Sequence, residues 1–148
     1  MVVHLPFDND YANLAPSTVV ATPVNTVAFG AGQIGAGALH FSSNPTNSAF
    51  NYVTLGTPPE LNFGGDVNLT VSLWVKFTAW KGDPSFISNK DWNSGGNLGW
   101  VLATAGDGRF QWNFTDGTGR HDYDADTDLR RRLHDHRRPL PDRVLVRM

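Results

Sequence analysis

Two tryptophans in polar, glycine-rich surroundings have the setting best suited to ligand binding in this sequence. Trp80 stands in the run TAWKGD, and Trp92 stands in the run KDWNSGGN. An exposed indole ring can stack on a pyranose ring while amides and carboxylates at its rim bond the sugar hydroxyls. The candidate carbohydrate-binding residues are therefore Trp80, Trp92, Asp91, Asn93 and Asn97. The alternative is that each Trp closes one end of the fold.

A second candidate is the pair of carboxylates at Asp8 and Asp10, which flank Asn9. A calcium ion takes about six to eight oxygen ligands, and this cluster supplies a few of them. An Asx turn, in which the carboxylate accepts a hydrogen bond from a nearby backbone N–H, explains the same residues equally well.

Catalytic carboxylates are scarce. Retaining glycosidases need two carboxyl groups about 5–5.5 Å apart, as two acids on one face of a strand would be. Glu60 is the sole Glu and lies in a Thr-Pro-Pro-Glu turn, and no expected strand before residue 120 carries two acids on one face. The absence of Cys removes a Cys nucleophile and a Cys-based metal site. Binding is therefore favoured over catalysis.

The elements that must position these residues are short β-strands. Apolar and polar residues alternate over 69–77, 98–102 and 109–114, which is the period-two pattern of a strand with one buried face. On this pattern Trp100 and Trp112 are core residues. Shorter candidate strands cover 4–7, 38–41, 51–55 and 85–89.

Turn residues separate these runs. Asp107-Gly108 stands directly before 109–114 and predicts a hairpin that joins this strand to the one over 98–104. The 148 residues include 15 Gly and 9 Phe, a composition typical of many short strands joined by tight turns. The length suits one domain.

The composition changes abruptly after Gly119. Residues 120–148 contain eight Arg, six Asp and no Gly, whereas residues 1–119 contain all 15 Gly. We therefore divide the chain into a β-sandwich over 1–118 and an Arg-rich tail over 119–148. The tail is typical either of a disordered charged linker or of a GC-rich stretch read out of frame. In the second case the sandwich lacks its last strands.

Three segments in order carry a family resemblance: GAGQIGAGALHF from Gly30, YVTLG from Tyr52 and LTVSLWVKF from Leu69. Together they resemble the concanavalin A-like lectin/glucanase superfamily, and in particular its laminin G-like jelly-roll domains, over about residues 4–118. The resemblance implies an all-β, antiparallel two-sheet β-sandwich of the jelly-roll type. It also implies a structural Ca²⁺ near Asp8 and Asp10, and an extracellular, secreted parent protein.

The predicted function is a non-catalytic, lectin-like carbohydrate-binding module of a larger secreted protein, with a polysaccharide or glycan as partner. A protein-binding adhesion module, and a glycoside hydrolase or polysaccharide lyase of the same superfold, are the alternatives. The net charge of −2 argues against nucleic acid as a partner. No run of about 20 apolar residues predicts a membrane span, and no signal-peptide pattern precedes the first strand.

Overall fold

A computed structural model of the chain describes residues 1–41, 50–62, 68–76, 85–90, 98–105, 109–115, 119–128 and 142–147, with the backbone alone in 124–128 and 142–147. The described elements are β-strands in antiparallel sheets, plus one turn of 3-10 helix, so the all-β prediction is confirmed. No helix in this part of the chain is long and apolar enough to cross a bilayer. The chain divides into two compact units, Met1–Val71 with Val146–Met148, and Ser72–Leu145. We call them the N-terminal unit and the second unit.

The N-terminal unit contains two small antiparallel sheets. Strand β1 (Thr22–Val24) pairs with β4 (Tyr52–Thr54), and β2 (Ala28–Gly30) pairs with β3 (Ala38–His40). The 3-10 turn Pro59–Leu61 follows β4. The predicted strands at 38–41 and 51–55 are thus present, while 4–7 forms no strand and β1 and β2 were not predicted.

The stretch before β1 is held by side chains instead of a strand ladder. The Asn13 amide donates to Ser17 Oγ and to the Val19 carbonyl, and its Oδ1 accepts from the His4 and Ala15 backbone N–H groups. This one amide therefore connects segments that a ladder would otherwise have to join.

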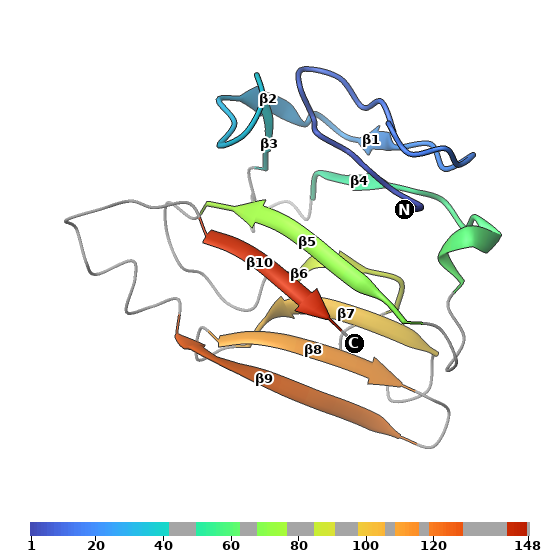
Figure 1. Ribbon diagram of the computed structural model, residues 1–148, viewed down its shortest axis with the longest axis vertical. Helices are drawn as coiled ribbons and strands as arrows, with labels where there is room; N and C mark the ends of the chain where they lie inside the picture. Colours follow the sequence, from blue (N-terminus) through green and yellow to red (C-terminus); the bar gives the residue numbers. More distant parts are fainter. Residues whose placement is uncertain are drawn as a thin grey trace. The chain divides into compact units, whose positions relative to one another are not determined.

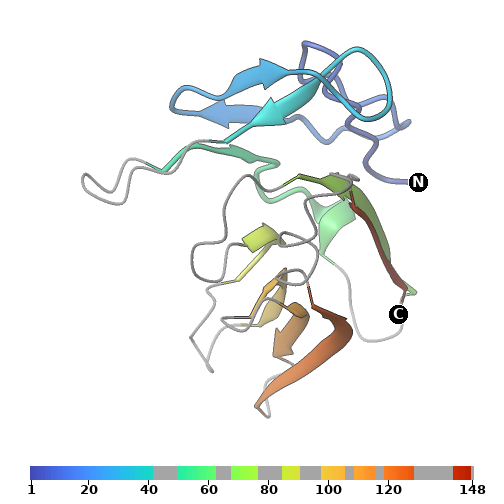
Figure 2. The same ribbon diagram turned by 90° about the vertical axis from the view of Figure 1, so that its left-hand side faces the viewer.

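The second unit is built on a four-stranded antiparallel sheet in the order β6-β7-β8-β9. Its strands are β6 (Ser85–Ser88), β7 (Gly99–Thr104), β8 (Arg109–Thr115) and β9 (Arg120–Asp128), shown from two sides in Figures 1 and 2. Consecutive strands are neighbours, so the predicted β7–β8 hairpin is confirmed in its pairing. Its Asp107-Gly108 turn lies outside the described residues.

The core of this sheet lies on β7 and β8. Val101, Leu102 and Ala103 are buried in succession, which shows that both faces of β7 are covered. Trp112 is buried as predicted, and Trp100 is partly buried and stacks on it at 4.9 Å. Leu98 is exposed and precedes β7, and burial within β7 runs through consecutive residues instead of following the expected alternation.

The strand content continues past residue 118, where the sequence pattern ends the sandwich. Strand β9 pairs with β8 from Arg120 to Asp128, and β10 (Asp142–Arg147) pairs with β5 (Thr70–Val75). The sequence analysis did not predict β9, because this segment contains four Asp residues and Asp has a low intrinsic strand propensity. The β8 ladder nevertheless pairs the backbone of this segment.

Candidate functional site

The register of the second unit's sheet places three residues in one row across its strands. Val101 on β7 lies opposite Asn113 on β8, and Asn113 lies opposite Asp122 on β9. Because side chains alternate between the two faces of a sheet, these three project from the same face. Neighbours such as Trp112 and Tyr123 project from the other face.

A hydrogen-bonded network occupies the face that holds Asn113. Lys90 Nζ donates to Asn113 Oδ1 at 2.9 Å, and Asn113 Nδ2 donates to Asp122 Oδ1 at 2.7 Å. Arg120 Nε donates to the same oxygen of Asp122 at 2.9 Å, and its Nη2 lies 3.5 Å from Gln111 Oε1. We call these five residues the polar network.

The polar network is buried at one end and open at the other. Asn113 has no exposed surface and Lys90 is 8% exposed, whereas the side chains of Arg120 and Asp122 are 27% and 39% exposed. Burying an ammonium group and an amide is costly unless both are hydrogen-bonded, as they are here. The buried end therefore fixes the geometry of the exposed ion pair.

The described residues on either side of segment 91–97, the predicted loop, are hydrogen-bonded to each other. The Asn89 N–H donates to the Trp100 carbonyl at 3.1 Å, and the Trp100 N–H donates to Asn89 Oδ1 at 2.7 Å. Between them Gly99 adopts φ +136°, and a Cβ there would overlap Asn89 Oδ1. Gly is therefore required at this position. Lys90, the last described residue before segment 91–97, is held by its hydrogen bond to Asn113.

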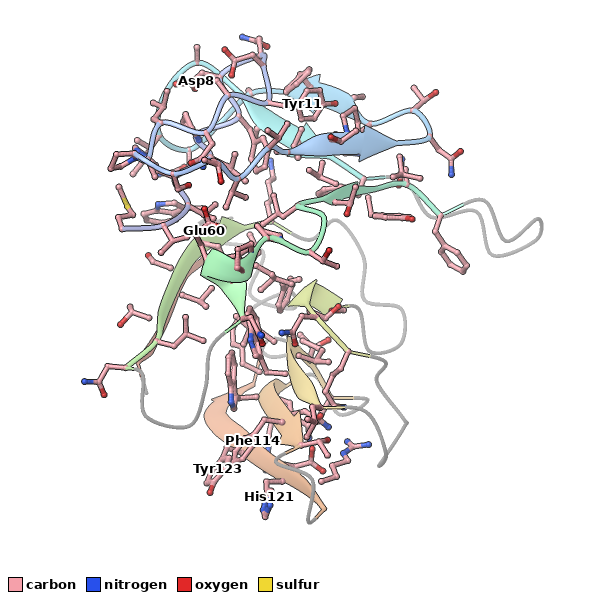
Figure 3. All side chains as sticks on the ribbon, turned by 90° about the vertical axis from the view of Figure 1, so that its right-hand side faces the viewer. Asp8, Tyr11, Glu60, Phe114, His121 and Tyr123 are labelled. Carbon is pink, nitrogen blue, oxygen red and sulfur yellow. The ribbon has the colours of Figure 1, made fainter. Side chains whose placement is uncertain are left out.

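The opposite face of the sheet is aromatic. Phe114 stacks against His121 at 4.9 Å and is nearly parallel to Tyr123 at 6.0 Å, and Trp100 stacks on Trp112. Figure 3 shows Phe114, His121 and Tyr123 gathered together on the second unit. This face forms core at β7 and β8 and becomes accessible at β9, where Tyr123 is 63% exposed.

The residues predicted from the sequence to bind carbohydrate lie outside the described residues. They fall in the segments 77–84 and 91–97, which precede and follow β6 in the sequence and which the sequence predicts to be loops. The affected residues are Trp80, Trp92, Asp91, Asn93 and Asn97. The structure does describe the residues on either side of the second segment, which are 85–90 and 98–105.

The predicted calcium ligands act in backbone hydrogen bonds. Asp8 Oδ1 accepts from the Ala36 and Gly37 N–H groups at 2.6 and 2.9 Å, and Asp10 Oδ1 accepts from the Ala12 N–H at 3.0 Å. The Asp10 contact is the Asx-type interaction that we considered as an alternative. Within the described side chains no group of three or more acidic or His residues could hold a metal. These residues thus offer fewer oxygens than Ca²⁺ takes, and calcium remains a prediction.

Glu60 lies in the 3-10 turn, as expected for a turn residue, and Figure 3 shows it there. The Thr18 hydroxyl donates to Glu60 Oε1 at 2.7 Å, and this bond is the main reason why the pKa of Glu60 lies below its usual 4.5. A lowered pKa keeps the carboxylate ionised, which is the opposite of what a general acid needs.

Sequence reasoning missed the polar network. A signal was present, because Gln111, Asn113 and Thr115 recur at every second position between the aromatics of β8. That pattern indicates a polar second face on a strand whose first face is core. The partners Lys90 and Asp122 are distant in the chain, and the pairing of β9 with β8 was needed to bring Asp122 to Asn113.

This chain matches no protein-family model, and no curated protein or solved structure showed a significant likeness to it.

Proposed function

We propose that this chain is a non-catalytic glycan-binding module that binds a polysaccharide through Trp92 and Trp80 in the loops on either side of β6. Such a module would act as part of a longer secreted protein. The observation that carries the proposal is the closed base of the 91–97 loop. Asn89 and Trp100 bond each other across it, and Lys90 is anchored to Asn113.

A rigid base matters because binding costs conformational entropy. A loop whose ends are fixed by a sheet loses less freedom when it contacts a ligand, so more of the contact energy appears as affinity. The residues after Lys90 are Asp91, Trp92 and Asn93, which supply an aromatic ring with polar groups beside it. This is the combination that recognises the apolar face and the hydroxyl rim of a pyranose.

Affinity electrophoresis through gels that contain soluble β-glucan, mannan, xylan or alginate tests the proposal. We expect retardation in at least one gel, and a loss of affinity of about tenfold or more for Trp92→Ala and Trp80→Ala. Trp74→Ala is the matched control, since Trp74 lies on strand β5 outside both loops and is partly exposed.

Folded protein that no glycan retards would overturn the proposal. Equal losses for Trp74→Ala and Trp92→Ala would also count against it, because they would point to general destabilisation. Release of oligosaccharide products from any of the polymers would identify an enzyme instead. Capture of a protein ligand without any glycan binding would identify an adhesion module.

A further inference from the structure

We propose that Arg120 and Asp122 on β9 form a saccharide-binding site, at which Asp122 accepts a hydrogen bond from one sugar hydroxyl and Arg120 donates to a neighbouring one. The inference rests on the proposed glycan-binding function. It adds a contact surface on β9 that is separate in sequence from the two tryptophan loops.

The exposed carboxylate of Asp122 has an oxygen available for a ligand. The hydrogen bonds that it accepts from Asn113 Nδ2 and Arg120 Nε both end on Oδ1. Among the side chains that the structure describes, none donates to Oδ2. Because the side chain is 39% exposed, this oxygen can accept a hydrogen bond from a molecule in solution.

The buried end of the polar network holds this carboxylate in a fixed orientation. Asn113 uses its oxygen for Lys90 and its nitrogen for Asp122, so its amide cannot rotate without losing both bonds. The β8–β9 ladder already pairs the backbones on both sides of Asp122. Asn113 thus has two roles, because the same amide accepts from the buried Lys90 ammonium and orients the carboxylate at the surface.

The chemistry of the pair selects a hydroxyl group over an ion. A metal cation would meet the Arg120 guanidinium, which lies 2.9 Å from the same carboxylate, and the described side chains supply no third acid. An anion would meet the Asp122 carboxylate. A hydroxyl group both donates and accepts, so two adjacent sugar hydroxyls can satisfy the acceptor and the donor together.

The site is also connected to the loop of the proposed function. Lys90 begins the path Lys90–Asn113–Asp122 and is followed directly by Asp91 and Trp92 in the chain. One polysaccharide that contacts both places would gain affinity from the two together, in the manner of linked sites.

NMR titration of the ¹⁵N- and ¹³C-labelled full chain with cellohexaose, laminarihexaose and mannohexaose tests the inference directly. We expect shifts at the Arg120 Nε–H and the Asp122 side chain together with shifts in 91–97. Shifts in 91–97 alone would overturn this inference and keep the proposed function. Shifts at 120–122 alone would keep this inference and overturn the assignment of glycan binding to Trp80 and Trp92. No shift with any hexasaccharide would overturn both.

Variants give a second readout in the same titration. Asp122→Asn is expected to weaken binding about tenfold, equal to about 1.4 kcal/mol, and Arg120→Gln to act in the same direction. Glu60→Gln and Arg109→Gln remove the same charges elsewhere and should bind as wild type. An unchanged affinity in Asp122→Asn would overturn the inference. A response of Asp122 to CaCl₂ or inorganic phosphate, without one to sugar, would also overturn it.

Discussion

Two carboxylates, one in each unit, accept two hydrogen bonds on a single oxygen and yet have different surroundings. Asp8 in the N-terminal unit accepts from the backbone N–H groups of Ala36 and Gly37. Asp122 in the second unit accepts from the side chains of Asn113 and Arg120. The first arrangement joins two stretches of chain, while the second adds side chains to strands that are already paired.

Each carboxylate contributes to a different level of the structure. Asp8 replaces missing secondary structure, since residues 4–7 form no strand and a carboxylate must hold the turn at Gly35 to Gly37. Asp122 lies within a regular ladder that does not depend on its side chain for backbone pairing. Loss of Asp8 should therefore loosen one turn, whereas loss of Asn113, which supports Asp122, should remove an acceptor from the buried Lys90 ammonium.

The largest effect is expected for Asn113→Leu, which removes the centre of the polar network. The buried Lys90 ammonium loses an acceptor, and the partly exposed Asp122 loses a donor, so the free energy of unfolding should fall by about 3 kcal/mol, mostly from the Lys90 end. Urea unfolding measures it. Asn68→Leu is the control at an exposed position. A loss below about 1 kcal/mol would show that the network is not a stabilising part of the sheet.

A smaller effect is expected for Gly99→Ala at the base of the 91–97 loop. The residue has φ +136°, and the added Cβ would overlap Asn89 Oδ1, so we expect a loss of about 2 kcal/mol. Gly119→Ala is the control, because a Cβ there meets nothing within 4 Å. Equal stability of the two variants in thermal unfolding would contradict the closed loop base.

The effect of Asp8→Ala should be local and about 1 kcal/mol. The Ala36 and Gly37 amides lose their acceptor, so their hydrogen exchange should accelerate while the amides of β7 and β8 keep their protection. Asp10→Ala serves as the control, because its carboxylate bonds Ala12 and not the Gly-rich turn. Faster exchange throughout β7 and β8 would show that the effect of Asp8 is not local.

The smallest effect concerns pH and Glu60. Because the Thr18 hydroxyl lowers the pKa of Glu60 in the folded state, the bond contributes stability above the usual pKa of 4.5. That contribution is lost as the pH falls through the lowered folded value. Thermal unfolding between pH 3 and 7 should show a shallower acid loss for Thr18→Val than for wild type. Thr26→Val is the control, and identical curves for Thr18→Val and wild type would refute the link.

The two units also differ in how much of their structure the sequence predicts. The hairpin of β7 and β8 was predictable because aromatic and polar residues alternate and Asp107-Gly108 separates the two runs. Alternation of this kind is a local signal, because it depends only on residues that are close together in the sequence. The same signal is weak in the N-terminal unit, where Asn13 and Asp8 replace strand ladders and β1 and β2 are three residues each.

Near neighbours in the chain suffice to predict the all-β class, the pairing of β7 with β8 and the placement of Trp112 in the core. Two features become evident from the fold alone: β9 extends the sheet, and the side chains of Lys90, Asn113 and Asp122, which come from three separate segments, meet on one face. Such contacts depend on the register between strands. A shift of one residue in that register would turn Asp122 to the aromatic face and leave Asn113 without its acceptor.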